Sequence, residues 1–351
     1  MSKLIEMNTK FPQTELWTDS FHVDHHEYGL SQGMTGVTTS PTWVSRMMLN
    51  EDGHEKVIHR LQKEYPEYNE QEMMWAWTLE MGKERSQIML PIWNQGNPKK
   101  GRFSIQTSIY DYNNKEKIVE MAKQVNACGV NMQVKIPSTP AGIEAMEEAT
   151  YLGISVMATV CFTVDQAIAV AEALERGMQR REQEGKDVSC LNPVCAVLLG
   201  MQDDYCKSYA ENNGIVIHPD AYCWPGVAIA KKVYSIYKER NYRTKMLVAY
   251  YRHQLHWSEF IGGDVLMTIP VKWQKRFENC DVEIKDYMSI PVDDFKIHEL
   301  MKLKPFELAY TEGSYCQSDF LSIPTVIATI HYFTEEYEKA VHKVREFMLP
   351  R

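Results

Sequence analysis

The chain has 351 residues, of which 44% are hydrophobic and 24% charged, and its formal net charge is -9. This acidic composition argues against a surface that binds nucleic acid or an anionic membrane. No apolar run approaches the roughly 20 residues that span a bilayer, and the N-terminal stretch lacks a signal-peptide core. We therefore expect a cytoplasmic protein whose partners are small molecules.

The eight cysteines are scattered and include no C-x-x-C pair. Several of them lie within apolar stretches, where reduced, buried thiols are more common than disulfides or zinc ligands. The cysteines therefore predict neither a disulfide framework nor a metal site.

Eight short runs of β-branched and apolar residues predict strands, at 15–21, 36–40, 102–108, 131–137, 154–162, 194–200, 245–252 and 265–270. Amphipathic stretches separate them, and three of these have apolar residues at helical spacing and end in glycine: 115–129, 141–153 and 164–177. Regular alternation of strand and helix requires a parallel sheet with right-handed crossovers.

An open, doubly wound sheet and a closed barrel both satisfy this alternation. No G-x-G-x-x-G follows the first strand, so the dinucleotide-binding form of the open sheet lacks its phosphate-binding turn. We therefore predict a single-domain α/β fold over 1–351, a (β/α)8 TIM barrel. Residues 41–100 would form inserted helices after the second strand, and residues 281–351 a helical C-terminal extension. The amphipathic end of that extension predicts packing over the barrel or against a second copy, so we expect a homo-oligomer.

Polar residues at the carboxyl ends of barrel strands converge on one cavity, where TIM barrels place their active sites. The predicted strands bring nine such residues to that end: Asp19, Thr38, Thr39, Ser40, Gln106, Lys135, Thr159, Tyr250 and Arg252.

Lys135 is the most informative of these residues because it lies within an apolar run. Burial destabilises an ammonium group and lowers its pKa from about 10.4 toward roughly 7 to 8. The neutral amine can form a Schiff base with a ketose, and the iminium then accepts electrons from the breaking C3–C4 bond. Asp19 is the candidate base for the C4 hydroxyl proton. Two structural alternatives stay open: Lys135 extending to solvent, and Asp19 capping a turn.

The run HVDHH at 22–26 follows the first predicted strand. Its histidine spacing is compatible with a metal site, but we expect a solvated loop at the rim of the cavity. Contact between substrate and His22 or His25 is an alternative that nothing else in the sequence supports.

Three strings, GVTTSP (36–41), VKIPST (134–139) and GISVMATVCFTVDQA (153–167), resemble the transaldolase family, including its fructose-6-phosphate aldolase branch. That family reads GVTTNPS, VKxPxTxxGI and GIxxxxTxxFSxxQA. The similarity also covers KMLVAYYR and GGDVLMTIP, and it extends in order over roughly residues 15–275. It implies a TIM barrel, a sugar or sugar-derived substrate, and Schiff-base catalysis that needs no cofactor and no metal.

The resemblance assigns roles to four residues. Lys135 matches the Schiff-base lysine, Asp19 the acid/base aspartate, and Thr159 the threonine that helps to hold the catalytic water. Gln106 lies where transaldolases have glutamate and where the aldolase branch has glutamine. It therefore favours aldolase-type cleavage without excluding transfer.

Several substrate-binding positions differ from the family pattern. Ser40 and Met157 replace asparagines that hold the dihydroxyacetone unit, and Leu198 replaces an aromatic residue. Met201 occupies the position of one phosphate-binding arginine, and Tyr250 that of a phosphate-binding serine, whereas Arg252 keeps the second basic position. With Thr38 and Thr39, these residues form the predicted substrate-binding set, and the changes argue against a sugar 6-phosphate.

The sequence leaves three functions open. The first is a transaldolase-like enzyme that transfers a dihydroxyacetone-type unit from Lys135. The second is an aldolase that releases free dihydroxyacetone or hydroxyacetone. The third, which survival of Lys135, Asp19 and Thr159 disfavours, is a non-catalytic barrel that serves as a binding subunit.

Overall fold

The computed structural model describes residues 2–349, and its centre is a closed barrel of eight parallel strands. Each strand pairs with its sequence neighbour, and β8 pairs with β1 to close the barrel. The strands are β1 (Glu15–Asp19), β2 (Gly36–Thr38), β3 (Arg102–Gln106), β4 (Met132–Pro137), β5 (Val156–Cys161), β6 (Val194–Leu198), β7 (Lys245–Ala249) and β8 (Leu266–Ile269). The predicted (β/α)8 TIM barrel is confirmed.

All eight predicted strands are present, and each is shorter than its apolar run. The missing residues lie mainly at the carboxyl ends, where Ser40, for example, caps a helix instead of extending β2. The strands themselves are almost entirely buried, and every residue of β4 and β5 is buried. Burial on both faces explains why they read as continuous apolar runs.

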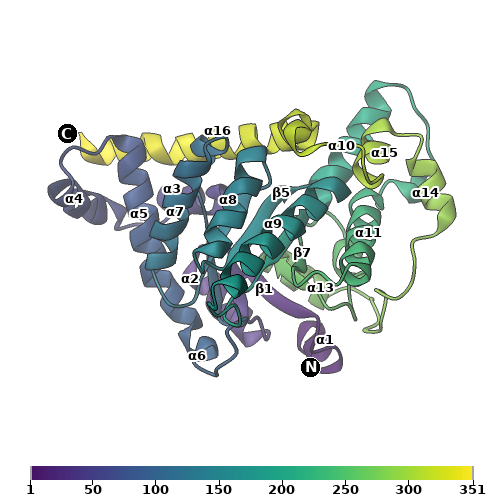
Figure 1. Ribbon diagram of the computed structural model, residues 1–351, viewed down its shortest axis with the longest axis horizontal. Coiled ribbons are helices and arrows are strands. Elements are labelled where there is room, and N and C mark those ends of the chain that lie inside the picture. The colour runs from purple at the N-terminus through teal and green to yellow at the C-terminus, as the bar shows by residue number, and fades with distance from the viewer. Residues whose placement is uncertain (1, 350–351) are drawn as a thin grey trace.

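Helices surround the barrel and cover the strands (Figure 1). They are α1 (Lys3–Lys10), α2 (Val23–Ser31), α3 (Pro41–Asn50), α4 (His54–Glu64), α5 (Glu70–Arg85), α6 (Leu90–Trp93), α7 (Lys115–Ala127), α8 (Pro140–Tyr151), α9 (Val164–Gln183), α10 (Leu199–Asn212), α11 (Pro225–Glu239), α12 (Leu255–Ser258), α13 (Val271–Glu278), α14 (Asp294–Leu300), α15 (Lys304–Tyr310) and α16 (Pro324–Met348). Four short 3-10 helices accompany them: η1 (Ser86–Met89), η2 (Ile109–Asp111), η3 (Pro219–Ala221) and η4 (Gln317–Ser322). Among residues 2–349, none of the helices is sufficiently long and apolar to cross a membrane.

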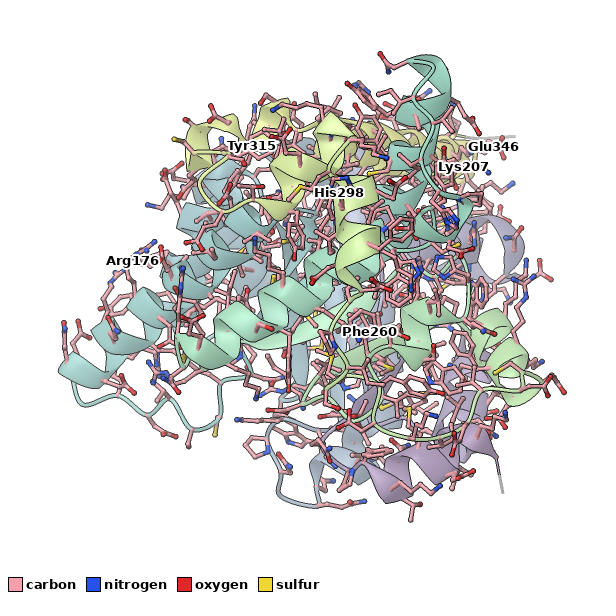
Figure 2. The ribbon with its side chains drawn as sticks, turned by 90° about the vertical axis from the view of Figure 1, so that its right-hand side faces the viewer. Arg176, Lys207, Phe260, His298, Tyr315 and Glu346 are labelled. Carbon is pink, nitrogen blue, oxygen red and sulfur yellow. The ribbon has the colours of Figure 1, made fainter. Side chains whose placement is uncertain are left out.

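Both predicted departures from the simple repeat are helical. Residues 41–100 contain α3 to α6, and the predicted extension, from residue 281 onward, contains α14 to α16. The predicted domain begins at residue 1, and its predicted extension ends at residue 351. Both of these residues lie outside the described residues 2–349. Figure 2 shows part of this extension with His298 and Tyr315 labelled, and α14 and α15 pack against η3, α10 and α11.

The long helix α16, yellow in Figure 1, runs across one end of the molecule. It packs against α3, α4 and α5, so the inserted helices and the C-terminal extension form one layer. This layer lies at the end of the barrel where β2 enters α3, which is the end that holds the predicted site residues.

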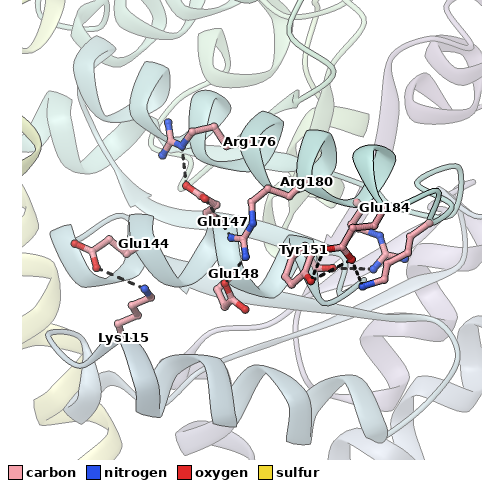
Figure 3. A network of polar contacts seen from close by, with 10 residues as sticks. Lys115, Glu144, Glu147, Glu148, Tyr151, Arg176, Arg180 and Glu184 are labelled. Atoms are coloured by element: carbon pink, nitrogen blue, oxygen red, sulfur yellow. Dashed lines mark hydrogen bonds and ion pairs between the residues drawn. The ribbon is translucent and has the colours of Figure 1, made fainter.

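The outer face of the barrel carries a different kind of contact. Glu147 and Glu148 of α8 form ion pairs with Arg176 and Arg180 of α9, at 2.7 to 3.2 Å (Figure 3). These side chains are substantially exposed, and exposed ion pairs typically contribute at most about 1 kcal/mol each. They fix the orientation of neighbouring helices more than they stabilise the fold.

Candidate active site

A cavity of about 250 Å³ opens at the carboxyl ends of the strands. Nine of the twelve residues predicted from the sequence line it: Asp19, Thr38, Ser40, Lys135, Met157, Thr159, Leu198, Tyr250 and Arg252. The other three, Thr39, Gln106 and Met201, are not among the lining residues. The site is therefore assembled from at least six of the strands, as barrel topology requires.

Lys135 lies on β4, in register with Gln106 of β3 and Met157 of β5. Its side chain is only 7% exposed, and Nζ donates a hydrogen bond to the Thr39 carbonyl at 2.8 Å. Burial lowers the pKa of Lys135 to about 8, although the nearby Asp19 carboxylate opposes this shift. At pH 7 about a tenth of this lysine is therefore a neutral amine, far more than for a lysine with the ordinary pKa of about 10.4, and one N–H direction is fixed by the backbone.

Asp19 ends β1 on the same cavity. The Thr38 hydroxyl donates to Oδ1 at 2.9 Å and also contacts the Thr268 hydroxyl of β8. Burial raises the pKa of Asp19 above its usual range, while Lys135 and hydrogen bonds from Trp43 and Thr38 oppose the change. A carboxylate whose ionised form is destabilised in this way is a better proton acceptor, which suits a general base.

Thr159 lies on β5 two residues after Met157, and both side chains line the cavity. The residue after it, Val160, has a φ of +57°, a conformation rare for a β-branched residue. The register between β5 and β6 shifts here, between Ala158 and Cys161. This bulge makes Thr159 the last residue of β5 that reaches the cavity.

Gln166 of α9 holds the bulge in place. Its Nε2 donates to the Val160 carbonyl at 3.1 Å and to the Ser138 carbonyl at the end of β4 at 2.9 Å, and its Oε1 accepts from the Phe162 amide at 3.0 Å. The side chain is fully buried. Gln166 therefore fixes the backbone that follows Thr159 and joins it to the end of β4.

Gln106 points into the barrel, because its register partner Lys135 lines the cavity and register partners in a sheet share a face. It is 5% exposed, and among residues 2–349 neither its amide oxygen nor its amide nitrogen has a hydrogen-bond partner. A buried amide of this kind is available to a small polar ligand or a water.

Thr39 and Met201 lie behind the cavity wall. The Thr39 hydroxyl donates to the Ser104 carbonyl at 2.8 Å, so this residue meets the site through its backbone carbonyl. Met201 lies in the first turn of α10, and its sulfur accepts a hydrogen bond from Thr329 of α16. The position where the family has an arginine is thus packed against the C-terminal helix.

Arg252 lines the cavity but already has a partner. Its Nε and Nη2 atoms contact Asp204 of α10 at 2.9 and 2.7 Å, and its guanidinium lies 4.8 Å from the centre of the Tyr250 ring. Although partial burial opposes the change, the Asp204 carboxylate raises the pKa of Arg252. Tyr250 itself has a φ of +71°, so the chain turns sharply after β7.

Asp203, His253 and His256 lie close enough together to suggest a metal site. Both histidine Nε2 atoms contact Asp203 Oδ2, at 2.9 and 2.7 Å, and the Gly226 amide donates to Oδ1. The backbone N–H of Arg252 donates to His256 Nδ1, so neutral His256 carries its proton on Nε2. That proton occupies the nitrogen that would bind a metal. The cluster is therefore a hydrogen-bond network that anchors the turn after β7.

The prediction that HVDHH forms a solvated loop is wrong. His22 caps α2, and residues 23–26 form its first turn. His22 contacts Glu51 through Nδ1, His25 contacts the Ser20 hydroxyl at 2.8 Å, and both rings pack edge-on against Trp43. The buried ring of His26 contacts the Ser20 carbonyl. The three rings thus have protein partners, which are Ser20 after β1, Trp43 of α3 and Glu51 at its end.

Sequence reasoning missed part of the lining: Trp43, Arg46, Tyr251, Lys272, Trp273, Tyr332 and Phe333. Trp43 and Arg46 follow the TTSP string at helical spacing, so that motif could have identified them. Tyr332 and Phe333 come from α16, and no local pattern connects that helix with the strand ends.

The chain matches the model of the transaldolase/fructose-6-phosphate aldolase family over residues 16–310. It is similar to a transaldolase of Thiobacillus denitrificans, with 26% identity over 235 residues, which is 64% of each chain. It is 29% identical to a transaldolase of Prochlorococcus marinus over 182 residues, covering 52% of this chain and 47% of that one. The chain thus belongs to the transaldolase/fructose-6-phosphate aldolase family, and the resemblance is confirmed. The match spans less than two thirds of these relatives' length.

Proposed function

We propose that the protein is a Schiff-base enzyme of the transaldolase type that acts on a ketose through Lys135. The observation that carries this proposal is a buried lysine, with its pKa lowered to about 8, in the same cavity as the Asp19 carboxylate. A neutral amine beside a base is the arrangement that carbonyl attack and retro-aldol cleavage both require. The names of the relatives favour the same chemistry.

In the first step, Lys135 Nζ attacks C2 of the ketose and forms a carbinolamine. Loss of its hydroxyl as water gives an iminium. Thr159 and Gln106 hold this water in place by hydrogen bonds. Thr159 lines the cavity, and the Gln106 amide has no hydrogen-bond partner among the described residues.

In the second step, Asp19 removes the proton from the C4 hydroxyl. The C3–C4 bond breaks, its electron pair moves into the iminium to form an enamine, and an aldehyde leaves. The enamine carbon then attacks the carbonyl carbon of an acceptor aldehyde, the iminium forms again, and the aldehyde oxygen takes the proton from Asp19 to become the new C4 hydroxyl. Hydration of the new iminium releases the product ketose and regenerates Lys135.

The donor is a ketose other than an ordinary sugar 6-phosphate. Two features support this part of the proposal: Met201 is packed against α16, and Arg252 is paired with Asp204. Neither position offers a free guanidinium, which would bind phosphate through two parallel hydrogen bonds.

The test is turnover of a ketose panel, each ketose with an added acceptor aldehyde, by the wild type and by Lys135→Met. We expect aldehyde release from at least one ketose by the wild type and none above background by the variant. Equal turnover by both proteins would contradict the proposal.

A second candidate is an aldolase that releases free dihydroxyacetone or hydroxyacetone, which Gln106 favours. The two functions differ in the fate of the enamine. Donor consumption that requires an added acceptor aldehyde would identify the transferase, whereas release of the free ketone without acceptor would identify the aldolase.

A further inference from the structure

Three cationic side chains line the rim of the cavity, and they differ in their partners. Arg252 follows β7 and is held by Asp204. Arg46 of α3 and Lys272 of α13 also line the cavity, and both are exposed. Within residues 2–349, neither Arg46 nor Lys272 has a carboxylate within ion-pair distance, and the guanidinium of Arg46 lies over the Trp43 ring.

Arg46 and Lys272 lie on the same side of the barrel. Arg46 is on the helix that follows β2, and Lys272 is on the helix that follows β8. These two strands are the neighbours of β1, which ends at Asp19. Arg46 is close enough to Asp19 to lower its pKa slightly, against the larger effect of burial. The two cations therefore flank the candidate base.

The local charge on this side of the cavity is positive although the whole chain is acidic. Neither α3 nor α13 has an acidic residue in its first turn, so the positive ends of both helices add to the two side chains. Positive charge in a concave site with apolar walls focuses its field on the opening and attracts anions. Trp43 and Trp273 supply such walls beside Arg46 and Lys272.

We propose that Arg46 and Lys272 bind an anionic terminal group of the ketose, and that they replace the cation pair expected after β6 and β7. This inference rests on the proposed function, because it concerns the substrate of the same cavity. The ligand class is a ketose with a carboxylate or sulfonate at the end remote from its carbonyl, and the phosphate is a comparison compound. The guanidinium of Arg46 offers two parallel N–H groups to such a group, and Lys272 adds a point charge.

The test compares kcat/KM for four matched ketoses that carry hydroxyl, carboxylate, sulfonate or phosphate at the terminal carbon. Wild type, Arg46→Gln and Lys272→Gln are assayed with each. We expect each variant to lose on the order of tenfold in kcat/KM for its anionic substrates, mainly through KM. For the neutral ketose we expect less than about a twofold change. The arm with the highest wild-type value identifies the anion.

Two kinds of control accompany these variants. Lys207→Gln removes an exposed cation of α10 that lies outside the cavity, and should leave both substrate classes unchanged (Figure 2). Arg46→Lys and Lys272→Arg keep the charge and should retain most of the preference for anions, which separates charge loss from misfolding.

Two results would overturn the inference. One is a wild type that prefers the neutral ketose. The other is a preference for anions that survives both Gln substitutions and disappears in Arg252→Gln. Borohydride trapping of neutral dihydroxyacetone on Lys135 needs no anion site, so its success alongside either result would reject this inference alone. Its failure with all ketoses would reject the proposed function.

Discussion

The residues on the floor of the cavity and those at its rim differ in their burial and in the groups that hold them in place. On the floor, Lys135 is buried and Asp19 half-buried, and they are fixed by the backbone or by short side chains of neighbouring strands. At the rim, Arg46 and Lys272 are exposed, and Arg252 pairs with a residue of the next helix. By the resemblance seen in the sequence, Lys135 and Asp19 are the residues expected on the floor, whereas Met201 and Tyr250 depart from those expected farther out. Chemistry and recognition can therefore change separately in this fold.

The largest expected effect comes from the floor. Lys135→Met should reduce turnover by about a thousandfold or more, because no other group can form the Schiff base. The same change should raise the free energy of unfolding at pH 7 by on the order of 1 to 3 kcal/mol, since it removes a buried ammonium. Denaturant unfolding measures this, and a destabilised variant would contradict the assignment of Lys135 as a strained catalytic group.

Asp19→Asn should lower turnover by roughly a hundredfold to a thousandfold, the usual contribution of a general base. Schiff-base formation precedes the step that needs Asp19. Borohydride should therefore still trap a ketose on Lys135 in this variant. Loss of trapping together with turnover would show that Asp19 acts earlier than we propose.

The pH dependence also belongs to the floor. Because the pKa of Lys135 is lowered to about 8, kcat/KM should rise about fivefold between pH 7 and 8 and level off above pH 9. The stability of the fold should also rise with pH. The unfolded lysine binds its proton up to about pH 10.4, so this group stabilises the fold increasingly as the pH rises from about 8 to 10.4. A flat profile of kcat/KM from pH 6 to 9 would contradict a lysine that must lose its proton.

Gln166 connects α9, on the outside of the barrel, with the backbone next to Thr159 on the floor of the cavity. Gln166→Met removes three hydrogen bonds around Thr159, and should lower turnover by about tenfold as Val160 leaves its positive φ. Val160→Gly makes that conformation favourable, so the double variant should recover several-fold. If Gln166 only stabilised the fold, turnover per folded molecule would stay at the wild-type level in all three variants.

The smallest effect should appear at the rim. Raising the salt concentration from 0.05 to 0.5 M should increase KM for an anionic ketose about two- to fourfold, because exposed charges are screened. The value of kcat should change little, since Lys135 is buried and Asp19 half-buried at the bottom of the cavity. A salt effect on kcat larger than that on KM would reverse the proposed division between floor and rim.

The same division explains what the sequence could predict. Lys135, Asp19 and Thr159 lie in strand-end motifs whose spacing is local, and barrel topology brings these ends together. The rim depends on contacts between distant segments. The pairing of Arg252 with Asp204, and the arrival of Tyr332 from α16, follow from helix packing that no motif records.

The prediction of a loop at 22–26 was wrong for a related reason. A cluster of histidines suggests solvent exposure when it is considered alone. Trp43 and Glu51, which give His22 and His25 their partners, come from the inserted helices and the turn that follows α3. Polar residues near a rim are thus assigned correctly only when the elements packed on them are known.

The most direct test of Schiff-base chemistry on the cavity floor is borohydride reduction in the presence of dihydroxyacetone or the preferred ketose, followed by peptide mass spectrometry. We expect one covalent adduct, located on Lys135, which is absent when Lys135→Met is treated in the same way. No adduct with any ketose, or an adduct on a different lysine that accompanies turnover, would contradict the assignment of Lys135.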